Sequence, residues 1–173
     1  MKPRRQRKST KTSPKLVFDS ERPDINIPDG FTMIMDTREQ IALFEPQNWI
    51  IDKGLKTGDF SILGFEDAIT IERKSLPDLF GTLGKGRERF EKEIVRMKKM
   101  NWYGMMIEGS EDDTMREQEW STMVVNQIYH ALSSYQIQGL HIYYAGSKGR
   151  ARDWVLSRLT RWYEHMREGR IVL

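Results

Sequence analysis

Short β-prone apolar runs alternate with longer amphipathic stretches along this chain, and this alternation limits the possible folds more than any other feature of the sequence. The β-prone runs cover residues 31–36, 60–63, 68–74, 102–108 and 140–145. Between and after them, apolar residues recur at helical spacing, as Phe90, Ile94 and Met97 do within residues 87–100. This order predicts one α/β domain with a mixed central sheet flanked by helices.

Two further helices and a hairpin complete this prediction. One helix is expected from Trp120 to about Gln138, with His130 making a core hydrogen bond, after an acidic loop at residues 111–113. The last helix ends near Gly169 and carries on its inner face Trp154, Val155, Leu159 and Trp162. A turn at residues 64–67 is expected to join the second and third β-prone runs as a β-hairpin.

The composition narrows the chemistry and the location. The chain has no Cys, and its 3 His are scattered, so any metal ion must be held by oxygen ligands. It contains no run of about 18 apolar residues, so no contact with a membrane is expected. We therefore expect an intracellular protein, cytoplasmic or nucleoid-associated, or nuclear in a eukaryote.

Positive charge is concentrated at the N-terminus. Seven basic residues precede the first acidic one, and without them the chain has 21 basic against 25 acidic residues. We interpret residues 1–27 as a flexible basic arm and residues 28–173 as the folded domain. The arm is either a DNA-binding segment or a solubilising or import segment, and its candidate phosphate contacts are Arg4, Arg5, Arg7 and Lys8.

Two carboxylates and a lysine are expected to meet at one end of the predicted hairpin. Alternate residues of a strand share a face, so Glu72 and Lys74 are neighbours. Antiparallel pairing through the turn would bring Asp59 opposite the Glu72 end. Such oxygen ligands suit Mg²⁺ or Mn²⁺, and the set would serve phosphodiester chemistry. The alternative for the tripeptide at residues 72–74 is a solvated strand end with surface ion pairs.

Four motifs resemble, in order and spacing, the nuclease domain of the XPF-type structure-specific endonucleases. They are Asp36-Thr37-Arg38-Glu39, Gly58-Asp59-Phe60, Ile71-Glu72-Arg73-Lys74 and Ser75-Leu76-Pro77-Asp78. The resemblance continues through Gly86-Arg87, Arg89-Phe90 and Glu93 and covers about residues 31–168. It implies a restriction-endonuclease-like core, cleavage of branched or flapped DNA that depends on Mg²⁺ or Mn²⁺, and a homodimer or a nuclease-like partner subunit.

The resemblance also implies roles for individual residues. Asp59 and Glu72 resemble the metal ligands, with the backbone carbonyl of Arg73 as a further one, and Lys74 resembles the catalytic lysine. Asp36 and Glu39 resemble the early acidic motif and are expected to border the metal site, and Asp78 resembles the final acid, with an electrostatic or structural role or direct ligation; all three are candidate catalytic residues. Candidate contacts to DNA phosphates are Arg38, Arg73, Lys85, Arg87 and Arg89. Many relatives append a helix-hairpin-helix module, so here the basic arm or a separate subunit is expected to supply duplex affinity.

Six aromatic residues within predicted strands and helices are interpreted as core or dimer contacts rather than as platforms for unpaired bases. They are Trp102, Tyr103, Tyr143, Tyr144, Trp154 and Trp162. The sequence thus predicts a metal-dependent endonuclease of DNA repair, recombination or replication. The alternatives are a non-catalytic DNA-binding subunit with the same fold and a sequence-specific restriction nuclease, which would need groove-reading side chains that the sequence does not identify.

Overall fold

A six-stranded mixed sheet forms the centre of the molecule in a computed structural model, which describes residues 24–39 and 41–173. The strand order across the sheet is β2-β1-β3-β4-β5-β6. The strands are β1 (Met33–Met35), β2 (Ile50–Asp52), β3 (Phe60–Ile62), β4 (Ile69–Lys74), β5 (Trp102–Ile107) and β6 (His141–Tyr144). The helices are α1 (Leu76–Leu83), α2 (Arg87–Met97), α3 (Glu111–Thr114), α4 (Val125–Ile137) and α5 (Lys148–Arg167).

The pairing directions divide the sheet into two halves. Strand β3 pairs antiparallel with both β1 and β4, which makes β3–β4 the predicted hairpin. Strands β4, β5 and β6 run parallel to one another, so their carboxyl ends meet at one edge of the sheet. Acidic and basic residues of the motifs lie at this edge. Strand β4 ends at Lys74, and Glu108 comes directly after β5.

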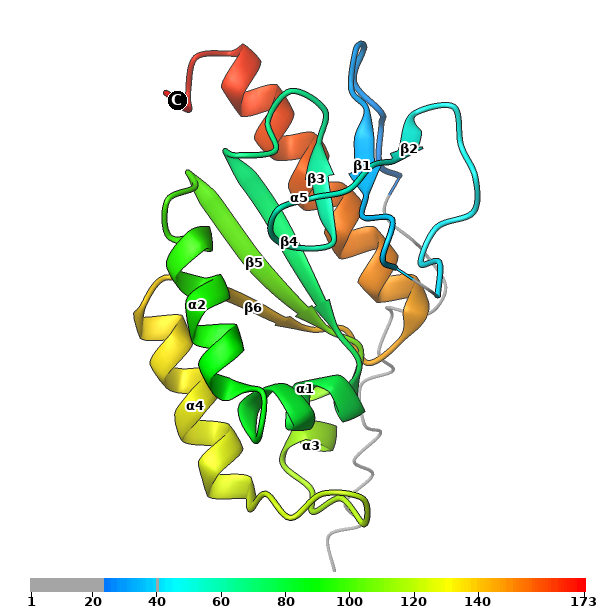
Figure 1. Cartoon of the computed structure of the whole chain (residues 1–173). Helices are drawn as coiled ribbons and strands as arrows, with labels where there is room; N and C mark the ends of the chain where they lie inside the picture. Colours follow the sequence, from blue (N-terminus) through cyan, green and yellow to red (C-terminus); the bar gives the residue numbers. More distant parts are fainter. Residues whose placement is uncertain (1–23, 40) are drawn as a thin grey trace, which may run out of the picture.

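Helices cover both faces of the sheet (Figure 1). Helix α5 lies along one face, where Trp154, Val155 and Leu159 pack on Ile69 and Ile71 of β4. Helices α1, α2 and α4 cover the other face, and Phe90 and Ile94 of α2 belong to the core on that side. Full burial of each large apolar side chain contributes about 1.5–3 kcal/mol, so these two layers hold the sheet in place.

The predicted fold class is confirmed, and the differences are local. Helix α4 begins at Val125 rather than at Trp120, because Trp120 lies outside the helix and packs edge-to-face on Phe80, with ring centroids 5.1 Å apart. The acidic loop contains a helical turn, α3, in which the Ser110 hydroxyl and the Asp113 carboxylate form a capping box. His130 is exposed, so its predicted core hydrogen bond is wrong.

Two elements have no counterpart among the sequence predictions. Strand β2 has three residues and pairs with β1 in parallel at the sheet edge; unlike the equally short β1 and β3, it was not among the β-prone runs, because its third residue is Asp52. Helix α1 starts directly after β4, where the Ser75 hydroxyl accepts a hydrogen bond from the Asp78 backbone N–H. Among the helices of the described residues, none has both the length and the apolar character needed to cross a bilayer.

Candidate active site

The β3–β4 hairpin brings two carboxylates together. Phe60 is opposite Ile71, and the Asp59 backbone N–H donates to the Ile71 carbonyl at 2.9 Å, so Asp59 lies beside the Glu72 end of β4. The Arg73 backbone N–H donates to Asp59 Oδ2 at 2.7 Å, which fixes the aspartate side chain against the facing strand. The two acids are 13 positions apart in the sequence and adjacent in space only because the hairpin closes.

A glycine makes this close approach possible. Gly58 has φ of +77°, and a Cβ atom there would lie 1.9 Å from Thr70 Oγ1. That hydroxyl donates at 3.0 Å to the carbonyl of Thr57, which ties the loop before Asp59 to β4. A larger residue at position 58 would therefore push the loop and Asp59 away from Glu72.

Burial and like charge set the electrostatics of the pair. Burial and the neighbouring Glu72 carboxylate together raise the pKa of Asp59 to about 8. Burial also raises the pKa of Glu72, which forms an ion pair with Lys74. Burial alone would lower the pKa of Lys74, but the neighbouring carboxylates, chiefly Glu72, outweigh burial and raise this pKa. The Lys74 ammonium also lies 5.6 Å from the ring centroid of Phe90. If both carboxylates were ionised, the pair would carry more negative charge than Lys74 neutralises, so Asp59 keeps its proton at neutral pH unless a cation binds.

Asp36 is in a different environment, although it is also buried. Its carboxylate accepts hydrogen bonds from the backbone N–H of Arg38 at 2.9 Å, from the Arg38 guanidinium at 2.6 and 3.0 Å, and from the backbone N–H of Leu55 at 2.5 Å. Burial opposes its ionisation, but these bonds prevail and lower the pKa of Asp36. Both oxygens are already used, so Asp36 organises the loop that leads to Asp59.

Arg73 joins three segments at the same edge of the sheet. Its guanidinium forms ion pairs with Glu39 at 2.8 Å and with Glu108 at 2.5 Å, and it donates to the carbonyl of Ile41. The Arg73 side chain is only 10% exposed. Arg73 therefore binds carboxylates in this structure, and its side chain holds the ends of β1, β4 and β5 together.

The family of this chain follows from its similarity to known proteins. The ERCC4 domain matches residues 36–157, which includes all four motifs. The chain belongs to the ERCC4 domain family. The family match and the shared fold confirm the predicted resemblance to the nuclease domain of XPF-type endonucleases.

Two solved structures of XPF from Aeropyrum pernix share the fold of this ERCC4 domain. The first has a TM-score of 0.60 at 20% identity, with 77% of this chain and 65% of that chain covered. The second, a complex with DNA, has a TM-score of 0.57 at 19% identity, with 78% of this chain and 65% of that chain covered. This chain thus matches about two-thirds of each of those structures. A search of curated proteins gives no match.

The remaining predicted residues lie at the rim of the ERCC4 domain or outside the described residues. Asp78 is exposed in the first turn of α1, where the Ser75 hydroxyl donates to its carboxylate at 2.6 Å. Lys85, Arg87 and Arg89 are exposed where α2 begins, and Arg87 pairs with Glu91 at 3.0 Å. The arm residues Arg4, Arg5, Arg7 and Lys8 lie outside the described part of the chain.

Two acidic residues near the site were not among the predicted site residues. Glu108 directly follows β5, and its backbone N–H donates to the Lys74 carbonyl at 2.9 Å, which places its side chain beside Arg73. Glu93 lies on α2, and its charge acts on Glu72 and Lys74. A polar residue directly after a buried parallel strand is a signal that could have identified Glu108.

The oxygen atoms available as metal ligands at this site suit a cation that keeps part of its water shell. Among the described residues, no three acidic or histidine side chains converge on one point as a metal cage would require. Mg²⁺ is commonly held by one or two carboxylates, with water and phosphate oxygens completing the octahedron. Asp59 and Glu72, with the backbone carbonyl of Arg73, fit that pattern of few protein ligands.

Proposed function

We propose that this protein is a metal-dependent endonuclease that hydrolyses phosphodiester bonds in branched or flapped DNA. The observation that carries the proposal is the pair of half-buried Asp59 and buried Glu72 beside Lys74 on the β3–β4 hairpin. A carboxylate with a pKa of about 8 is costly to ionise in isolation. A divalent cation removes that cost, so the pair suits a metal better than it suits a purely structural role.

Each residue of the hairpin has a proposed task. Asp59 and Glu72 would hold Mg²⁺ or Mn²⁺ together with the Arg73 carbonyl, in line with the preference of these ions for oxygen. When bound, the metal polarises the phosphoryl oxygen and favours ionisation of water. Lys74 lies beside Glu72, where its ammonium can orient the attacking water or offset negative charge that develops on the phosphate.

The DNA is proposed to follow the basic rim of the domain. Lys85, Arg87 and Arg89 are exposed at the start of α2, on the same side of the sheet as Glu72. Arg38, which forks onto Asp36 while its side chain remains 69% exposed, is a further candidate contact. Asp78 and Glu39 are proposed to shape the field around the site rather than to ligate the metal, since Glu39 is paired with Arg73.

Further parts of the proposal concern assembly and setting. A homodimer, or a dimer with a nuclease-like partner subunit, would bring a second DNA-binding surface to the branched substrate. We place the activity in DNA repair, recombination or replication, in the cytoplasm or nucleoid, or in the nucleus of a eukaryote. Cross-linking during DNA titration and sedimentation of the free protein would measure the subunit number directly.

A cleavage assay tests the proposed function. Labelled flap, fork, four-way and linear duplex DNA are incubated with the protein, with and without Mg²⁺ or Mn²⁺, alongside Asp59→Ala, Glu72→Gln and Lys74→Ala. We expect metal-dependent cuts in branched DNA that all three variants reduce by roughly 10²-fold or more. Glu88→Gln, on an exposed part of α2, is the matched control and should cut normally. DNA binding without cuts would instead identify a non-catalytic subunit.

The basic arm is proposed to add sequence-independent affinity for DNA phosphates. Seven cations lie within residues 2–15. Their removal should weaken DNA binding and reduce the dependence of affinity on salt, because fewer counterions are released. Cleavage at saturating DNA should persist. An unchanged salt dependence after deletion of residues 2–15 would remove DNA binding from the roles of the arm.

A further inference from the structure

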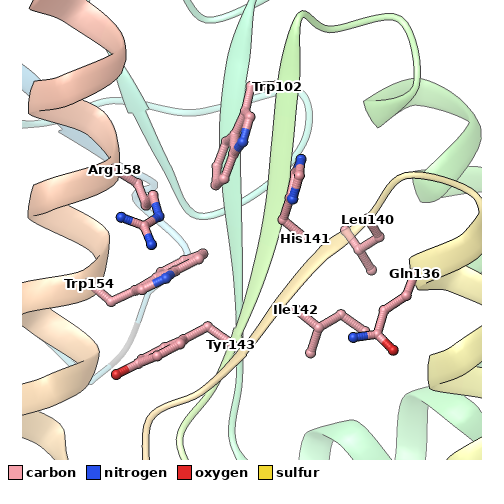
Figure 2. Close-up of a pocket in the computed structure, with 8 residues that line it drawn as sticks. All are labelled: Trp102, Gln136, Leu140, His141, Ile142, Tyr143, Trp154 and Arg158. Carbon is pink, nitrogen blue, oxygen red and sulfur yellow. The ribbon is translucent and has the colours of Figure 1, made fainter.

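A hollow lined by stacked aromatic rings lies at the free edge of the sheet, away from the acidic site. It has a volume of about 600 Å³, within the usual range of ligand pockets of roughly 300–1,000 Å³. Figure 2 shows it between β6 and α5, and its walls come from Trp102, Gln136, Leu140, His141, Ile142, Tyr143, Trp154 and Arg158. Among the described residues, β6 pairs only with β5, so its outer edge is open.

Two stacked pairs of rings form the walls. Trp102 and His141 are stacked with centroids 5.1 Å apart and an interplanar angle of 9°, and Tyr143 and Trp154 are stacked at 5.1 Å and 2°. Trp102 and Trp154 are 6.0 Å apart and tilted by 46°, so the two pairs diverge as Figure 2 shows. His141 is exposed, which leaves its outer face available to a further flat ring.

The rings that line the hollow differ in how far they are buried in the core. Trp154 is buried, as its predicted core role requires, with Tyr143 on one side and the Arg158 guanidinium 5.5 Å from its centroid. Trp102 and Tyr143 pack against the core but stay partly exposed. For Trp102 and Tyr143, the sequence-based interpretation as core or dimer contacts therefore leaves the exposed part of each ring without an assigned role.

The charge of the hollow is opposite to that of the hairpin site. None of the described residues that line it is acidic, whereas Arg158 is a cation. Arg158 is exposed. Within residues 24–39 and 41–173, it forms no ion pair with an acidic side chain. Gln136 adds an amide that can donate and accept hydrogen bonds at the rim.

We propose that this hollow binds an unpaired nucleobase of single-stranded DNA, with the His141–Trp102 pair as the stacking platform and Arg158 as a contact to the neighbouring phosphate. Flat rings bind any base through its π-face, and an unpaired cation attracts the backbone, so the combination suits single strands without sequence preference. A purely aliphatic groove would lack both features.

The position of the hollow agrees with this occupant. Trp102 is level with Ile69 at the start of β4, while Lys74 is level with Ile107, five residues further along the strands. At about 3.3 Å per residue, the platform lies about 16 Å along the sheet from the catalytic end, and it is on the α5 face whereas Glu72 and Lys74 are on the α2 face. It would therefore contact an unpaired arm of the substrate some nucleotides away from the cut. The choice of DNA rests on the proposed function, but the binding itself needs no catalysis.

Binding of two matched oligonucleotides, measured by anisotropy in EDTA so that no cleavage occurs, tests the site. One probe is a dye-labelled oligothymidine of about 15 nucleotides, and the other is an abasic strand of the same length and charge. We expect the full chain to bind the base-containing strand about tenfold more tightly than the abasic one, since stacking depends on the bases.

Exposed residues make suitable variants because their loss should not unfold the protein. His141→Ala should abolish the preference for bases, and His141→Phe should retain it. Arg158→Ala should weaken the binding of both strands and Arg158→Lys should restore it. The control is Arg161→Ala, on the same helix but paired with Glu164 and outside the hollow.

Three results would overturn the site. The first is equal binding of both strands by the unaltered protein, and the second is a preference that survives His141→Ala. The third is a change of oligomeric state in sedimentation caused by His141→Ala or Arg158→Ala with the preference intact, which would assign the surface to a second copy of the chain. A failed cleavage assay with a persistent base preference would refute only the endonuclease, and the reverse result would refute only this site.

Discussion

Asp36 and Asp59 are two aspartates of the same site whose surroundings differ in two respects, the supply of hydrogen-bond donors and the presence of a second carboxylate. Asp36 accepts bonds from Arg38 and from the Leu55 backbone, and its pKa is lowered. Asp59 accepts one bond from the Arg73 backbone and faces the Glu72 carboxylate, and its pKa is raised to about 8. Burial raises the pKa of both carboxylates. The hydrogen-bond donors around Asp36 outweigh this effect, whereas the single donor at Asp59 does not.

The comparison separates structural from chemical carboxylates within one motif set. An aspartate whose oxygens are all bonded stabilises the folded state and has nothing left for a ligand. An aspartate held near a second carboxylate destabilises the folded state until a cation or a proton joins it. Asp36 thus belongs to the scaffold, and Asp59 belongs to the pair that we propose holds a metal.

The largest effect on folding is expected from Asp36→Asn. This change removes the charge from hydrogen bonds to Arg38 and Leu55 and gives an amide whose N–H₂ would face two donors. We expect a loss of about 2–3 kcal/mol, or a melting temperature lower by roughly 4–12 °C, in thermal unfolding followed by circular dichroism. The control is Asp67→Asn, which alters an exposed ion pair. Equal melting of the two variants would place Asp36 outside the scaffold.

A divalent cation should stabilise the protein through the other aspartate. At about ten times its Kd, Mg²⁺ or Mn²⁺ should contribute about 1.4 kcal/mol to folding, which is roughly 3–6 °C in melting temperature. Because the pKa of Asp59 is about 8, the cation must displace a proton at neutral pH, so its apparent affinity should rise between pH 6 and pH 8. Asp59→Asn should show no such stabilisation. A pH-independent affinity would contradict the coupling of Asp59 to Glu72.

Asp59→Asn should change stability in the opposite direction to Asp36→Asn when no metal is present. The folded pKa of Asp59 exceeds the ordinary value of 3.8, so the folded state binds the proton more tightly and loses stability as pH rises from about 4 to about 8. Asparagine removes this loss and still accepts the bond from Arg73. The variant should melt about 2–4 °C higher than the unaltered protein at pH 8, with a smaller difference at pH 5. A lower melting temperature at pH 8 would refute the contrast.

The sequence contains enough information to place Asp59 and Glu72 together but not enough to separate their roles from that of Asp36. The strand alternation at residues 69–74 and the short turn before it predict the hairpin, because both are local features. The bond from Leu55 to Asp36 and the pairing of Arg73 with Glu108 join segments 19 and 35 positions apart. Their partners depend on how β1, β4 and β5 are ordered in the sheet, which no periodicity encodes.

The same reasoning explains the elements that the sequence predicted imperfectly. Helix α5 was predictable because Trp154, Val155, Leu159 and Trp162 recur on one face, and all four are buried. Strand β2 is recognisable only from its pairing with β1, since its third residue is Asp52. Helix α4 begins late because Trp120 packs on Phe80 instead of continuing the helix, which is a tertiary contact.

The smallest effect is expected where a carboxylate is neither saturated with donors nor buried. Glu88 pairs with Lys92 one helical turn later at 2.8 Å, but its side chain is 84% exposed. Water solvates Glu88 in both the folded and the unfolded states, so Glu88→Ala should cost less than about 0.5 kcal/mol in urea unfolding. It should also leave the effect of Mg²⁺ on melting unchanged. A loss as large as that of Asp36→Asn would show that the charge itself, rather than its burial and its donors, determines what each acidic residue contributes.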